Sequence, residues 1–127
     1  MASAGVTWQE VQQTPEDGKR REAIGGELYV TGPATVRHQR VTQRLRMQLY
    51  RLLEDSGYGE ILPGPIGVEF PSTGEGVQPD TIFISEEHRG LIADDWIRGA
   101  PDLIVETVSP DTAERDRGVK LDLYRRQ

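Results

Sequence analysis

Two acidic residues stand beside apolar runs, where charged side chains are uncommon. Glu106 lies inside the apolar run of residues 103–108, and a carboxylate buried in a strand is costly unless it is paired. Three explanations are open: Glu106 faces solvent on an edge strand, a basic side chain neutralises it, or it binds a metal ion. Asp80 opens a second apolar run, residues 81–85. It is either a turn residue after Pro79 or a partner of Glu106 in holding Mg²⁺ or Mn²⁺.

Lys120 is the third candidate, on the helix expected after the run that contains Glu106. The turn at Ser109 would fold that helix back over the strand. A lysine beside a metal site can position the attacking water or stabilise charge on a phosphate. The alternative is an exposed lysine that pairs with Asp116 one helical turn earlier. Together, two carboxylates and a lysine suit metal-dependent hydrolysis of a phosphodiester.

A β-hairpin is expected near the N-terminus. Residues 21–24 and 27–30 form two short extended runs around Gly25-Gly26, which is a typical hairpin turn. In the second run, Leu28 and Val30 share one face, while Glu27 and Tyr29 share the other. The preceding residues 1–20 are polar and predict a flexible segment, which leaves residues 21–127 as the folded domain.

A helix is expected over residues 35–55, ended by Gly57. Its apolar residues recur at spacings of three and four and form a stripe: Val41, Leu45, Leu49, Leu52 and Leu53. His38 falls within this arc, so we expect it to point inward. A neighbouring stripe is basic and contains Arg37, Arg40, Arg44 and Arg51. It is either a solvated helix face or a track for nucleic-acid phosphates.

The rest of the chain alternates short strands with turns. Strands are expected at residues 61–62, 66–70 and 81–85, a polar turn at 71–76, and a loop with a short helix at 86–99. Residues 102–108 are expected to form a central, fully buried strand, and a helix follows from about residue 112. This order predicts an α/β (α+β) fold with a mixed central sheet flanked by helices.

Composition narrows the classes of function. The 127 residues suit one domain, and the absence of cysteine excludes disulfides, zinc thiolates and a thiol nucleophile. We see no signal peptide and no apolar run long enough to cross a bilayer, so a cytoplasmic location is expected. The net charge of −6 argues against nucleic-acid binding. Its weight is partial, because an enzyme that binds a metal ion must itself carry carboxylates.

Five stretches together resemble a known family. In chain order they read GGELYV, RHQRV, VQPDTIFIS, GAPDLIVETVSPDT and DRGVKLDLY. In order and spacing they resemble the Uma-type family of bacterial restriction endonucleases, which belongs to the PD-(D/E)XK nuclease superfamily. The resemblance runs from about residue 24 to the end of the chain. It implies a restriction-endonuclease-like fold and nuclease activity.

The resemblance also implies roles for single residues. Asp80 would bind the metal together with Glu106 of the central strand. Lys120 would be the catalytic lysine, which in this family has moved from the strand to the following helix. Glu27 would be a further acidic catalytic residue.

Two polar positions, Gln78 and His38, match the family and would line the same cleft. The ordinary alternative for His38 is a buried histidine with a satisfied hydrogen bond. The sequence departs from the superfamily at Val108, where the short E-X-K pattern has its lysine. Activity would therefore depend on Lys120 reaching the site.

These observations favour a Mg²⁺- or Mn²⁺-dependent endonuclease that acts on nucleic acid, most simply DNA. Two alternatives stay open: a nuclease fold that binds without catalysis, and a protein-interaction module. The arginines Arg37, Arg40 and Arg44 are the expected nucleic-acid contacts. Relatives implied by the resemblance continue with further strands, so we expect a domain lacking its last strands and, through an open sheet edge, a homodimer.

Overall fold

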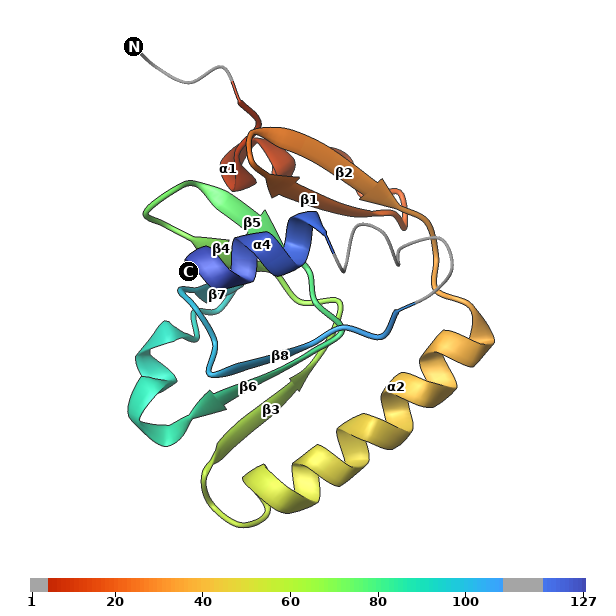
Figure 1. The fold of residues 1–127 in the computed structure, drawn as a ribbon, viewed down its shortest axis with the longest axis vertical. Helices are drawn as coiled ribbons and strands as arrows, with labels where there is room; N and C mark the ends of the chain where they lie inside the picture. The colour runs from red at the N-terminus through yellow and green to blue at the C-terminus, as the bar shows by residue number, and fades with distance from the viewer. Residues whose placement is uncertain (1–4, 109–117) are drawn as a thin grey trace.

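The computed structural model describes residues 5–108 and 118–127, and Figure 1 shows its elements. In chain order they are α1 (Trp8–Val11), β1 (Arg20–Ile24), β2 (Glu27–Thr31), α2 (Val36–Leu49), the π-helical turn η1 (Tyr50–Glu54), β3 (Gly59–Pro63), β4 (Val68–Phe70), β5 (Glu75–Val77), β6 (Thr81–Ser85), the 3-10 helix η2 (Glu86–Leu91), β7 (Ile97–Arg98), β8 (Leu103–Val105) and α4 (Val119–Arg126).

The strands form two sheets within the described residues, where the sequence predicted one mixed sheet. One sheet has five strands in the order β2-β1-β5-β4-β7, and the other has three in the order β3-β6-β8. The chain passes from one sheet to the other directly between β5 and β6, where Gln78, Pro79 and Asp80 lie. The mixed α and β composition agrees with the prediction, and the division places Asp80 at the junction.

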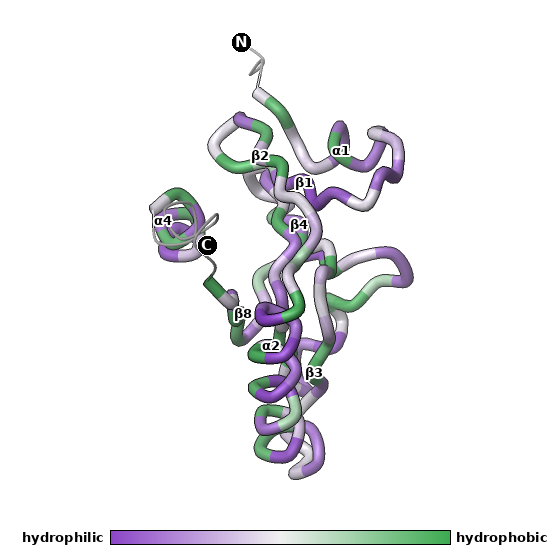
Figure 2. The backbone as a smooth tube through the Cα atoms, turned by 90° about the vertical axis from the view of Figure 1, so that its right-hand side faces the viewer, coloured by the Kyte–Doolittle hydropathy of each residue, from purple (hydrophilic) through white to green (hydrophobic). Residues whose placement is uncertain are grey.

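The predicted hairpin is confirmed as β1 and β2. Gly25 and Gly26 turn the chain with φ angles of 61° and 82°, a region that glycine adopts without steric cost. Because strand side chains alternate, Glu22 and Ile24 share one face of β1 and Ala23 takes the other. Ile24 packs with Leu123 of α4, whereas Ala23 packs with Trp8 of α1. Figure 2 accordingly shows α4 and α1 on opposite sides of the sheet.

The predicted flexible start is wrong for the residues around α1. Trp8 and Val11 are one helical turn apart and are both buried, with Trp8 only 2% exposed. The indole ring lies so close to Gly67 and Gly76 that a side chain at either position would clash with it. This segment therefore covers the face of the five-stranded sheet that lies opposite α4.

The order of burial among the later strands also differs from the prediction. The middle strand of the smaller sheet is β6, whose first four residues are buried. The predicted central strand, residues 102–108, is the short β8, which has β6 as its one neighbour among the described strands. Leu103 is 39% exposed, so an apolar run did not mean a fully buried strand here. Glu75 and Gly76, expected in the turn over residues 71–76, belong to β5 instead.

The predicted helix over residues 35–55 is confirmed as α2 followed by η1, but its inward face is not the apolar stripe. Val41, Leu45 and Leu52 are exposed, whereas Thr42 is buried. His38 points to the sheet, as expected. The polar face turns inward because it makes the hydrogen bonds described below. The helix predicted from residue 112 is observed as α4, and its expected first part, with the Ser109 turn, lies outside the described residues.

No helix within residues 5–108 and 118–127 combines the length and the apolar character that crossing a membrane would require.

Candidate active site

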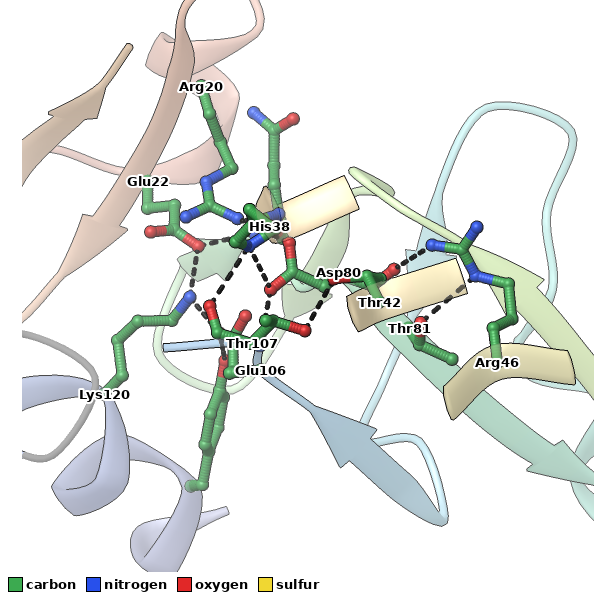
Figure 3. A network of polar contacts seen from close by, with 12 residues as sticks. Arg20, Glu22, His38, Thr42, Arg46, Asp80, Thr81, Glu106, Thr107 and Lys120 are labelled. Atoms are coloured by element: carbon green, nitrogen blue, oxygen red, sulfur yellow. Dashed lines mark hydrogen bonds and ion pairs between the residues drawn. The ribbon is translucent and has the colours of Figure 1, made fainter. Parts of the chain in front are cut away.

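Side chains from both sheets and from two helices meet at the junction between the sheets (Figure 3). Strand β1 contributes Arg20 and Glu22, and Asp80 lies immediately before β6. Glu106 and Thr107 follow β8 directly, where the strand pairing has ended. Helix α4 supplies Lys120, and helix α2 supplies His38, Thr42 and Arg46.

Lys120 joins two glutamates in the interior. Its side chain is completely buried, and its Nζ donates to Glu22 Oε2 at 2.8 Å while also contacting Glu106 Oε2. The backbone N–H of Gln78 donates to the same Glu22 oxygen at 2.8 Å, and the hydroxyl of Tyr124 donates to Glu106 Oε2 at 2.8 Å. One lysine therefore neutralises part of the charge of two carboxylates and holds them together.

The two glutamates are not equally satisfied by this arrangement. Burial raises the pKa of Glu22, but the charges of Lys120 and Arg20 outweigh it, so the pKa lies below its ordinary value. Burial also raises the pKa of Glu106, and Lys120 offsets this only in part, while the nearby charge of Glu22 raises it further. Each carboxylate keeps one buried oxygen, Oε1, without a hydrogen-bond partner. The site therefore holds negative charge that the protein itself does not fully compensate.

Asp80 is held by three groups. Its Oδ2 accepts a 2.7 Å hydrogen bond from the backbone N–H of Thr107 and lies 3.3 Å from His38 Nε2. Its Oδ1 lies 3.4 Å from Arg20 Nη1. The Arg46 guanidinium holds the adjoining chain, because it donates to the backbone carbonyl of Asp80 and to the side-chain hydroxyl of Thr81. The carboxylate is 9% exposed and has little freedom to turn.

Thr107, two residues after the end of β8, contacts helix α2. Its carbonyl lies 3.1 Å from His38 Nε2, and its hydroxyl lies 2.6 Å from that of Thr42. A carbonyl oxygen can only accept, so His38 Nε2 must carry the proton in this contact. These bonds fix the residue next to Glu106 and therefore the direction of the glutamate.

The pair of hydroxyls gives a test of this link. Thr107→Val should lower the free energy of unfolding by about 1–2 kcal/mol, because it leaves the buried hydroxyl of Thr42 without its partner. The double variant Thr42→Val/Thr107→Val should lose less than the sum of the two single variants, since it leaves no orphaned hydroxyl. Urea unfolding of the four proteins measures this. Strictly additive losses would contradict the contact.

Most of the predicted site residues meet in the structure. Asp80, Glu106 and Lys120 lie in one contact network, and His38 joins it through Asp80 and Thr107. Gln78 also takes part, through its backbone N–H to Glu22 and its side-chain amide, which donates to the Arg21 carbonyl.

Glu27 is not brought to this network, which contains Glu22 instead. Glu27 begins β2 opposite Ile24, at the turn end of the hairpin, and is exposed. Its carboxylate accepts from the hydroxyl of Tyr29 at 3.1 Å. Glu22 was missed, although one signal was present: it lies two residues before Ile24 and so shares the inward face of β1.

The donor set fits a divalent cation. Three carboxylates, those of Asp80, Glu22 and Glu106, face two cationic side chains, Lys120 and Arg20. Within the described residues, no group of three or more His, Asp and Glu side chains is placed to hold a metal ion alone. Mg²⁺ requires less, because it usually takes one or two carboxylates and keeps several waters. The bare Oε1 atoms of the two glutamates are ligands of the required type.

The sequence matches the Uma2 family, described as "Putative restriction endonuclease", over residues 8–127. The chain belongs to this family. Among curated proteins, none matches it. Solved structures do, one of them a crystal structure of a "putative nuclease" from Anabaena variabilis with a TM-score of 0.75 and 15% sequence identity. The match covers 94% of this chain and 67% of that one. The structural likeness confirms the predicted fold, and the family to which this Uma2 chain belongs carries the description of a restriction endonuclease.

Proposed function

We propose that this Uma2 chain is a Mg²⁺- or Mn²⁺-dependent endonuclease that hydrolyses phosphodiester bonds of nucleic acid, with DNA as the preferred substrate. The observation that carries the proposal is the buried network of Glu22, Glu106 and Lys120 beside Asp80, in which two carboxylate oxygens lack partners. A structural ion pair would satisfy these atoms, since bare buried charge is destabilising. Their retention favours a site that binds a cation.

The contacts of each residue indicate its role in the proposed reaction. Asp80 and Glu106 would hold the cation, and Glu22 would complete the acidic set in place of Glu27. A bound divalent ion supplies a water of lowered pKa and positive charge next to the phosphate. Lys120 fixes the two glutamates and orients the water that lies against them. His38 and Thr107 keep Asp80 aligned through their bonds to its Oδ2.

The nucleic acid would lie along α2. Arg37, Arg40 and Arg44 are exposed on it, and a shallow hollow of about 410 Å³ is lined in part by Arg40 and Arg44. Phosphate contacts of this kind supply affinity without reading sequence. The expected homodimer stays a prediction, with β8 as one of the edge strands among the described strands that could pair with a second copy.

A cleavage assay tests the proposal. Supercoiled plasmid, single-stranded DNA and RNA would be incubated with Mg²⁺, Mn²⁺ or EDTA. Asp80→Asn and Glu22→Gln should each slow cleavage by about 100-fold or more, the size of effect seen when one group that stabilises the transition state is removed. Glu27→Gln is the matched control, because it removes an exposed charge from the same hairpin and should leave the rate unchanged.

A second candidate is a nuclease fold that binds nucleic acid without cutting it. The net charge of −6 and the lack of a described three-ligand group favour it. Folded wild type that neither cuts any substrate nor binds Mn²⁺ in calorimetry would overturn the enzyme proposal in its favour.

A further inference from the structure

Within the part of the chain that the structure describes, three lysine or arginine side chains reach the site, and all three make contacts there. Lys120 is completely buried, and its ammonium group faces Glu22 and Glu106. Arg46 donates to Thr81, to the Asp80 carbonyl and to Gln43 on its own helix. Lys120 cannot meet a substrate phosphate without losing its contacts with the two glutamates, and the hydrogen bonds of Arg46 go to neutral groups.

Arg20 differs from Lys120 in its exposure and from Arg46 in contacting a carboxylate of the site. Its side chain is 14% exposed, so part of it reaches the surface of the site. Its Nη1 donates to the Gln78 carbonyl at 3.0 Å and lies farther, at 3.4 Å, from Asp80 Oδ1. The shorter bond goes to the backbone, so the guanidinium can stay in position while its contact with Asp80 is exchanged for another anion.

Arg20 also lies where positive charge has most effect. It contacts Asp80, and its charge also acts on Glu22. Burial raises the pKa of Glu22, but the charges of Lys120 and then Arg20 outweigh burial and keep the pKa below its ordinary value. A phosphodiester that enters against these carboxylates brings further negative charge to the same place. An arginine can offer two parallel N–H groups to phosphate oxygens and stays charged at any physiological pH.

We infer that Arg20 is the residue of this chain that binds the scissile phosphate, exchanging its contact with Asp80 for a non-bridging phosphate oxygen. This inference rests on the proposed nuclease function and names the group that contacts its substrate. Lys120 then holds the glutamates and orients the water, and it does not contact the phosphate. No bond forms or breaks at Arg20, which only stabilises the charge that builds on the phosphate during hydrolysis.

The test compares Arg20→Gln and Arg20→Lys with Arg21→Gln. Arg21 is the matched control, because it is the next residue of β1, faces the other side of the strand, and forms an ion pair with Asp17. The position at which wild type cuts an oligonucleotide is mapped first. A second oligonucleotide then carries an uncharged methylphosphonate at that position. Affinity for both is measured with a divalent ion that does not support cleavage.

Arg20→Gln should lower kcat by about 100-fold and leave KM almost unchanged, as expected when a transition-state contact is removed. Wild type and Arg21→Gln should prefer the charged diester by the same factor. Arg20→Gln should lose most of this preference, and Arg20→Lys should recover part of it. A purely structural role would not change the preference for charge, and unfolding temperatures report any loss of stability separately.

Two outcomes would overturn the inference, and they can be told apart. A folded Arg20→Gln protein that keeps the full preference for the charged diester would show that Arg20 does not meet the phosphate, while the nuclease function stands. Wild type that neither cuts nor binds nucleic acid would overturn the proposed function and the role of Arg20 with it.

Discussion

Replacing Lys120 with methionine should abolish cleavage and lower the free energy of unfolding by about 3–5 kcal/mol, the usual cost of removing one partner of a buried ion pair. The ammonium group is buried and contacts both Glu22 and Glu106. Methionine keeps most of the side-chain volume but removes the charge, so two buried carboxylates are left close together. Urea unfolding at pH 7 in EDTA measures the loss, and the plasmid assay measures the activity.

The loss should shrink as the pH falls. Without Lys120, the pKa of at least one glutamate rises above its ordinary value of 4.5, because burial and the neighbouring carboxylate both disfavour its charged form. A carboxyl whose pKa is raised in the folded protein stabilises the fold at low pH and loses that contribution as the pH rises. The variant should therefore approach wild type as the pH is lowered toward about 5.

Lys19→Met is the control for this experiment. Lys19 is the other lysine of the sequence and is exposed, so its replacement should change stability by less than about 0.5 kcal/mol. A similarly small, pH-independent change in Lys120→Met would contradict the burial of Lys120 between the glutamates.

The parts of this site that the sequence predicted are those with a local signal. Glu106 is conspicuous because it interrupts an apolar run, and Asp80 because it opens one. Of the three explanations left open for Glu106, the structure bears out a basic partner, Lys120, and the metal ion stays a proposal. A side chain can have both roles, since neutralisation by Lys120 leaves one carboxylate oxygen bare.

Glu22 could not be predicted in this way, because what buries it is far away in the chain. Its partner Lys120 is 98 residues later, on a helix that packs over β1. Within β1, Glu22 has an ordinary position in a short polar strand, and Glu27 has the same residue type five residues later. Glu22 and Glu27 lie on the same face of the hairpin, because Glu22 pairs with Tyr29 and Ile24 pairs with Glu27. What separates the buried glutamate from the exposed one is its distance from the turn at Gly25-Gly26.

The orientation of α2 illustrates the same limit. The spacing of its apolar residues correctly predicted a helix, but not which face turns inward. Burial of Thr42 is favoured because its hydroxyl and the His38 ring bind Thr107, and a hydrogen-bonded polar face can be buried at little cost. The spacing of apolar residues therefore predicts that a helix forms, but it does not predict which face is buried where a polar network lies beneath the helix.

Glu22→Gln and Glu106→Gln should change stability in opposite directions in metal-free protein. The charged form of Glu22 is favoured by the fold, so the neutral amide should lower the free energy of unfolding by about 1.5–3 kcal/mol, the range for hydrogen bonds to charged groups. The charged form of Glu106 is disfavoured by burial, so Glu106→Gln should raise the free energy of unfolding. Urea unfolding at pH 7 in EDTA compares the two isosteric variants directly.

Their pH dependence should differ as well. The contribution of Glu22 is present above the ordinary glutamate pKa of 4.5 and is lost as the pH falls below it, because its pKa in the folded protein is lowered. The contribution of Glu106 is present below 4.5 and is lost as the pH rises through its raised pKa in the folded protein. Glu22→Gln should therefore flatten the acid side of the stability curve, and Glu106→Gln should flatten the side above 4.5.

Comparing Glu22→Gln with Glu106→Gln also separates an effect on stability from an effect on nuclease activity. Both variants should be poor nucleases, although only Glu22→Gln is less stable, because a site that binds a cation has to keep charge that folding alone would remove. If Glu106→Gln were instead destabilised as strongly as Glu22→Gln, Glu106 would be an ordinary member of a structural ion pair. The unsatisfied charge on which the proposed metal site depends would then be absent.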